Sequence, residues 1–77
     1  MEDTATRIRA IICQFTGILP KDILHENALY EELQLDSLDI IEIIMNLEDD
    51  LGVDISDEAV QDLKTIQDLI ATVDRAR

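Results

Sequence analysis

The chain has 77 residues, and its 18 acidic and six basic residues give a formal net charge of −12 at neutral pH. This length accommodates one small domain, and the charge argues against nucleic acid and anionic membranes as direct partners. Hydrophobic residues make up 47% of the chain, but Phe15 and Tyr30 are its only aromatic residues. A helical bundle is therefore favoured over a strand-rich fold.

The charges are unevenly distributed along the chain. Between Asp22 and Leu63 there is no lysine or arginine, although this span holds fourteen of the 18 acidic residues. The middle of the protein is therefore expected to present a negative surface, which implies basic partners.

Cysteine usage and hydropathy bear on where the protein works. Cys13 is the only cysteine, so no internal disulfide can form, and this usage fits a reducing compartment. The residues from Met1 to Thr4 do not place a basic region before an apolar run, and no apolar segment is long enough to span a bilayer. We therefore expect a cytoplasmic protein with no signal peptide and no membrane insertion.

A stripe of apolar residues predicts the first helix, over residues 4–16. The stripe recurs at spacings of three and four residues and consists of Ala5, Ile8, Ile11, Ile12 and Phe15. Asp3 or Thr4 is suited to cap this helix, and Gly17 followed by Pro20 is suited to end it.

Residues 18–35 form the longest predicted connection. Connections of this length are uncommon in compact domains unless they are functional or pinned by their own apolar residues. We expect Leu29 and Leu33 to anchor this one, with a short helical turn over residues 27–32. His25 has no second histidine or cysteine at ligand spacing, so we expect a surface residue with no metal or catalytic role.

The helix predicted over residues 37–51 has two unlike apolar faces. The face expected to line the core consists of Ile40, Ile43, Ile44, Leu47 and Leu51. On nearly the opposite side lie Leu38 and Met45, with Ile41 at the flank, and they share this outer face with Glu42, Glu48 and Asp49. Large apolar side chains are thus expected among acids on the solvent side.

Two further helices complete the predicted fold. Ser56 is suited to cap a short helix that runs to Asp62, and Thr65 with Asp68 resembles a capping pair for the last one. The apolar stripe of the last helix consists of Ile66, Leu69, Ile70 and Val73. The expected fold is all-α, a single domain over residues 1–77 in which three principal helices and one short helix form a small bundle.

The start of the second long helix places a serine between two aspartates. Asp36 in the capping position, with Asp39 three residues later, satisfies free backbone donors there. The cap fixes Ser37 in the first turn with its hydroxyl outward, where the positive end of the helix dipole favours a phosphate ester. The residues alone leave two interpretations, a simple helix cap and a site of phosphate-ester attachment.

Enzymatic and metal-binding interpretations of this stretch lack the residues they require. A nucleophilic serine needs a neighbouring base, and the single His25 lies in the preceding loop without an orienting partner. Gly17 and Gly52 are the only glycines, so a glycine-rich phosphate loop is missing. Residues 49–54 also do not have the alternating oxygen ligands of a calcium loop. We therefore expect a protein that is not an enzyme.

The Asp36-Ser37-Leu38-Asp39 stretch, at this position in a short acidic chain, resembles the acyl carrier proteins, whose Asp-Ser-Leu motif carries 4′-phosphopantetheine on the serine. The resemblance extends over nearly the whole chain, to the start of the last helix at Thr65. Many members have a glycine shortly before the motif, where this chain has Gln34 and Leu35, and this departure leaves open a specialised carrier.

The resemblance implies that a phosphopantetheinyl transferase esterifies Ser37 with the 4′-phosphopantetheine of coenzyme A, and that the terminal thiol carries an acyl chain as a thioester. Other implied partners are acyl-transfer, condensing and further synthase enzymes with basic patches, which a monomeric carrier serves in fatty acid, lipid or polyketide synthesis. The family also shelters the acyl chain between its second and third helices. The implied partner-binding residues are Asp36, Leu38, Asp39, Ile41, Glu42, Met45, Glu48 and Asp49.

Two alternatives stay open from the sequence. One is a carrier of the same kind for aminoacyl or peptidyl groups. The other is an unmodified acidic helical adaptor that binds one basic partner through the patch of Leu38, Ile41 and Met45.

Overall fold

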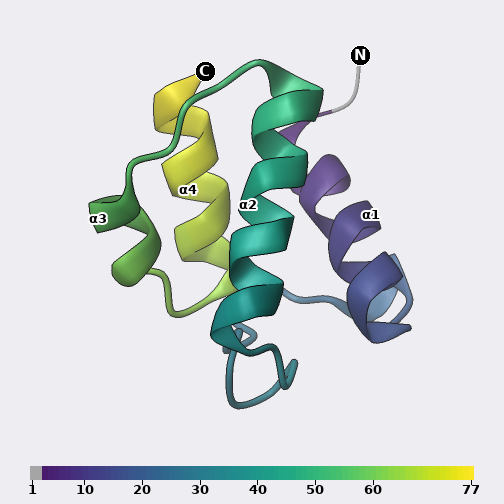
Figure 1. Cartoon of the computed structure of the whole chain (residues 1–77). Helices are drawn as coiled ribbons and strands as arrows, with labels where there is room; N and C mark the ends of the chain where they lie inside the picture. Colours follow the sequence, from purple (N-terminus) through teal and green to yellow (C-terminus); the bar gives the residue numbers. More distant parts are fainter. Residues whose placement is uncertain (1–2) are drawn as a thin grey trace.

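The computed structural model describes residues 3–77, and Met1 and Glu2 lie outside the described residues. Its elements in chain order are α1 (Thr4–Thr16), the short 3-10 helix η1 (Pro20–Asp22), α2 (Ser37–Leu51), α3 (Asp57–Gln61) and α4 (Ile66–Ala76) (Figure 1). Within residues 3–77 the β pairing is limited to an isolated bridge between Ala28 and Thr65. The all-α bundle is confirmed, and the observed bounds of α1 and α2 match those predicted.

Short polar side chains and glycines set the ends of the two long N-terminal helices. The Asp3 carboxylate caps α1 by accepting a hydrogen bond from the Thr6 N–H at 2.8 Å. Hydrogen bonding with Thr6 lowers the pKa of the Asp3 carboxyl, because it favours the charged form. Gly17 and Gly52 end α1 and α2 with φ of 78° and 65°, a left-handed conformation that glycine adopts without steric cost.

The two C-terminal helices begin at their predicted caps but differ in how they pack. Ser56 caps α3 by accepting from the Ala59 N–H at 3.1 Å, and no residue of α3 is buried. Thr65 and Asp68 cap α4 reciprocally, and this helix buries its predicted stripe. The contact of α3 with the core is made by the half-buried Val60.

The core is aliphatic and is built from the long helices. α1 packs against both α2 and α4, and α2 runs through the centre of the molecule in Figure 1. Burial of one such aliphatic side chain stabilises the fold by about 1.5–3 kcal/mol. The most deeply buried side chains include Ile8 and Ile12 of α1, Ile40, Ile43 and Leu47 of α2, and Ile66, Leu69 and Val73 of α4.

The long connection between α1 and α2 is packed, as predicted, and its buried residues are Ile23, Leu29, Leu33 and Leu35. The Leu29 N–H donates to the Lys64 carbonyl at 2.8 Å, which joins the loop to the residues before α4. The short helical turn predicted over residues 27–32 is present as a single turn, in which the Glu32 N–H donates to the Ala28 carbonyl at 3.1 Å. The Leu33 N–H donates to the same carbonyl. The connection also contains the 3-10 helix η1, which was not predicted.

Candidate functional site

Ser37 is the first residue of α2, and its side chain is exposed. The preceding Asp36 caps the helix, since its Oδ1 accepts the Asp39 N–H at 2.8 Å. Asp39 returns the contact by accepting the Asp36 N–H at 3.2 Å through Oδ2. This reciprocal pair confirms the predicted cap and holds Ser37 in the first turn without using the serine hydroxyl.

The backbone just before Ser37 is fixed by one buried residue and one unusual conformation. Leu35 is buried, and its N–H donates to the Leu29 carbonyl at 3.1 Å. Gln34 has a φ of 57°, and within residues 3–77 it is the only residue other than glycine with a positive φ. The sequence alone does not report this backbone angle.

The outward apolar patch predicted on α2 is present. Leu38, Met45 and Ile41 are 71%, 58% and 48% exposed, whereas the core-facing isoleucines of the same helix are buried. Because apolar side chains of this size rarely remain exposed as a group without reason, the patch is a candidate contact surface.

The acidic residues of the predicted site fall into two groups. Asp36, Glu42 and Asp49 are exposed, and Asp39 is half-buried in the cap. Glu48 is half-buried as well, and its Oε2 accepts the Ile55 N–H at 2.9 Å. Glu48 thus has an internal structural contact that the helical wheel did not reveal, and its role toward partners stays a prediction.

Metal-ligand clusters and membrane-spanning helices are both absent from the described residues. Within residues 3–77, no three His, Cys, Asp or Glu side chains are grouped to hold a metal ion. Nor does any helix of the described chain have the length and apolarity needed to cross a membrane. His25 is exposed, and its carbonyl accepts the Gln67 N–H at 2.8 Å.

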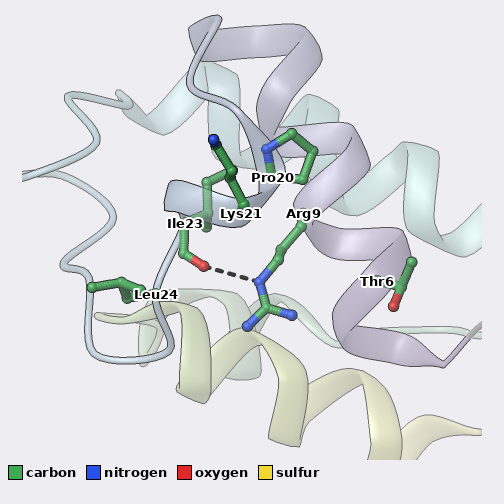
Figure 2. A pocket seen from close by; sticks show the side chains of 6 residues that line it. All are labelled: Thr6, Arg9, Pro20, Lys21, Ile23 and Leu24. Atoms are coloured by element: carbon green, nitrogen blue, oxygen red, sulfur yellow. Dashed lines mark hydrogen bonds between the residues drawn. The ribbon is translucent and has the colours of Figure 1, made fainter.

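A surface hollow of about 320 Å³ lies beside α1 and η1, and none of the predicted site residues lines it. Figure 2 shows the Arg9 side chain reaching from α1 to the Ile23 carbonyl, which accepts from Arg9 Nε at 2.9 Å. This contact fastens the loop after η1 to α1. A second hollow, of about 370 Å³, is lined by residues that flank Ser37 in the sequence, including Leu35 and Asp39.

Comparison with known proteins places these features in a family. The family model described as the phosphopantetheine attachment site matches residues 6–73. An acyl carrier protein of Zymomonas mobilis is 36% identical over 74 residues, which cover 96% of this chain and 95% of the relative. This chain belongs to the acyl carrier protein family. The acyl carrier protein of Thermosynechococcus vestitus is 39% identical over 64 residues, covering 83% of this chain and 79% of that protein. The crystal structure of the Thermotoga maritima acyl carrier protein superposes with a TM-score of 0.78 at 28% identity, covering 91% of this chain and 81% of that one.

As a member of this family, the chain is a carrier protein and not an enzyme, and its prosthetic group is 4′-phosphopantetheine. The start of α2 fits such a group, because the Ser37 hydroxyl is exposed and takes no part in the cap. A carrier of this family interacts with synthase and transferase enzymes.

Proposed function

We propose that residues 1–77 form a single carrier domain and that Ser37 is the residue that bears 4′-phosphopantetheine. The observation that carries this proposal is the exposed Ser37 hydroxyl at the first position of α2, held there by the reciprocal cap of Asp36 and Asp39. The N-terminal end of a helix favours the negative charge of a phosphate ester.

In this proposal Ser37 Oγ is the nucleophile of a phosphoryl transfer from coenzyme A. It forms a bond to the phosphorus that bears the pantetheine arm. The bond from that phosphorus to the leaving adenosine bisphosphate breaks, and the Ser37 proton passes to a base. The described residues place no base in hydrogen bond with Ser37, so the base is assigned to the transferase. The thiol of the bound arm supplies the thioester linkage for the acyl cargo.

Partner enzymes are proposed to dock on the outward face of α2. An apolar patch surrounded by charge is suited to a transient interface, because burial of the patch supplies affinity and the charges supply specificity. Long-range attraction by acids raises the encounter rate with basic enzymes without making the complexes long-lived. The proposed contacts are Asp36, Leu38, Asp39, Ile41, Glu42, Met45, Glu48 and Asp49.

The proposed setting is the cytoplasm, where a monomeric carrier serves fatty acid, lipid or polyketide synthesis. The net charge of −12 supports the monomer, since copies of the chain repel each other. Identification of the thioester-bound cargo on protein isolated from its native cell decides the pathway. An aminoacyl or peptidyl cargo would assign the carrier to a pathway other than fatty acid, lipid or polyketide synthesis.

The proposed attachment is tested by incubating the purified protein with coenzyme A and a promiscuous phosphopantetheinyl transferase, followed by intact mass measurement. We expect one phosphopantetheine to be added to the wild-type chain and none to Ser37→Ala, because only Ser37 offers an exposed hydroxyl at the start of α2. Absence of the added mass from the wild-type chain, or its presence on Ser37→Ala, would refute the assignment.

The exposed patch of Leu38, Ile41 and Met45 also supports a second candidate, an unmodified adaptor that binds one basic partner. Complementation in the native cell separates the two functions. The adaptor predicts that Ser37→Ala is fully active there, whereas the carrier predicts complete loss of function.

A further inference from the structure

The hollow of about 320 Å³ beside α1 and η1 is positively charged, although the chain as a whole carries a net charge of −12. Arg9 and Lys21 both line this basic hollow, and no acidic residue does. Three other surface hollows, of about 370, 410 and 480 Å³, each have at least one carboxylate in their lining. The basic hollow therefore favours a negatively charged occupant, whereas most of the surface favours a positively charged one.

The Arg9 side chain is held in place while its outer donors are unused. Its Nε donates to the Ile23 carbonyl at 2.9 Å, which restrains the guanidinium. Its two terminal nitrogens form no hydrogen bond within the described chain, and Figure 2 shows them between Leu24 of the loop and Thr6 of α1. Asp3 attracts Arg9 electrostatically, but its carboxylate caps α1 and does not line the hollow. The terminal nitrogens are thus available to bind a carboxylate at two points.

Lys21 and Leu24 supply the other features of the basic hollow. The Lys21 ammonium forms no hydrogen bond or ion pair within the described chain, and in Figure 2 it points away from Arg9. It therefore adds long-range attraction and not a second fixed contact. Leu24 is 48% exposed, as much as Ile41 of the apolar patch on α2, and Pro20 extends the apolar lining. The hollow thus combines the two-pronged end of an arginine with an aliphatic wall.

We propose that the basic hollow docks a segment of a partner protein in which a carboxylate side chain and an aliphatic side chain are neighbours. The carboxylate accepts from the terminal nitrogens of Arg9, and the aliphatic side chain packs on Leu24 and Pro20. A free phosphate would use the arginine but leave the aliphatic wall exposed to water. The combination of charge and apolar surface therefore selects a protein segment.

The location of the basic hollow keeps this partner off the outward face of α2. The lining residues belong to α1, to η1 and to the start of the following loop, and none belongs to α2 or flanks Ser37. The partner is also opposite in charge to the basic enzymes proposed for α2. One protein can thus retain the carrier through this hollow while other enzymes bind α2, and this docking does not depend on modification of Ser37.

The test is an NMR titration of the isotope-labelled full chain with a short capped peptide of glutamates and leucines. At about 150 mM salt the screening length is about 8 Å, so distant acids of the carrier do not repel the peptide. We expect the amide signals of Lys21, Ile23 and Leu24 to shift with a common dissociation constant. A matched peptide of glutamines and leucines lacks the carboxylates and should bind about fivefold more weakly, as expected for an exposed ion pair.

Four variants make the test specific. Arg9→Lys keeps the charge but not the paired donors, and should raise the dissociation constant about fivefold. Lys21→Gln and Leu24→Ser should each raise it about twofold, because one removes attraction and the other removes apolar contact. Lys64→Gln removes an exposed lysine outside the basic hollow and should leave it unchanged. Thermal unfolding is measured in parallel, and Leu24→Ser carries the test if Arg9→Lys, which alters the contact with Ile23, fails to fold.

The inference is overturned if the three amides do not shift, if Lys21→Gln and Leu24→Ser bind the peptide as tightly as the wild-type chain, or if Lys64→Gln weakens binding as much as they do. Inorganic phosphate is titrated as well. If it shifts the same amides with an equal or lower dissociation constant, the hollow is a simple anion site and the proposed protein segment is wrong. No step of this titration involves Ser37, so failure of the attachment assay and failure of this inference are distinguishable.

Discussion

At the scale of single residues, Asp36 combines two properties that substitution can separate. Its Oδ1 accepts the Asp39 N–H at 2.8 Å, and its charge lies beside the Ser37 hydroxyl. Asp36→Ala removes the acceptor and should lower the free energy of unfolding by about 1 kcal/mol, the usual cost of losing an N-cap. Asp36→Asn keeps an acceptor of equal capping quality and should cost less than half as much. Urea unfolding measures both variants, and an equal loss in the two would show that the charge, and not the cap, stabilises α2.

The residues around Ser37 also show what a sequence can and cannot predict. The cap of Asp36 was predictable, because its spacing from Asp39 is local and uses nearby backbone donors. The positive φ of Gln34, which lies between the buried Leu33 and Leu35, was not, because no local pattern reports a backbone angle. The contact of Glu48 with Ile55 was missed for a similar reason, since it depends on how the chain turns after Gly52.

At the scale of elements, the linker between α2 and α3 is held by a side chain of α2. Glu48 Oε2 accepts the Ile55 N–H at 2.9 Å, while α3 itself buries no residue. Glu48→Ala should therefore speed hydrogen exchange of the Ile55 amide about tenfold, the factor that corresponds to one hydrogen bond to a charged group. Glu48→Gln keeps an acceptor and should retain most of the protection. NMR exchange of individual amides measures the effect.

Asp49→Ala is the matched control for this linker contact, because Asp49 is exposed and adjacent but makes no contact with the linker. Its Ile55 amide should exchange at the wild-type rate. If Asp49→Ala accelerates exchange as much as Glu48→Ala, the general loss of negative charge is responsible and the specific hydrogen bond is not.

The helices were largely predictable as elements, whereas their connections were predictable only in part. Apolar spacing located α1, α2 and α4, because each must bury one stripe against the others. Packing of the long connection was also expected from its leucines. However, the bridge from Ala28 to Thr65 joins segments far apart in the chain, and no local pattern encodes it.

At the scale of the whole molecule, net charge opposes the fold and assists its proposed partners. The described residues span 28 × 25 × 19 Å, so at about 10 mM salt, where the screening length is about 30 Å, charges repel across the entire molecule. At about 150 mM salt the screening length falls to about 8 Å, and only neighbouring charges interact. Some pairs relieve the repulsion locally, such as Arg7 with Asp50 at 2.7 Å, but the net charge of −12 remains.

Salt should consequently have opposite effects on folding and on docking. Raising sodium chloride from about 10 to 150 mM should stabilise the fold by about 1 kcal/mol, which moves the midpoint of thermal unfolding upward by about 4–8 °C for a domain of this size. Over the same range the KM of the transferase for the carrier should rise, because screening weakens attraction between the acidic surface and a basic enzyme. The double variant Glu42→Gln with Asp49→Asn removes two exposed charges and should show smaller changes in both quantities. A thermal unfolding midpoint that stays constant or falls with salt would mean that favourable ion pairs outweigh self-repulsion. A KM that is insensitive to salt would mean that docking depends on the apolar patch of Leu38, Ile41 and Met45.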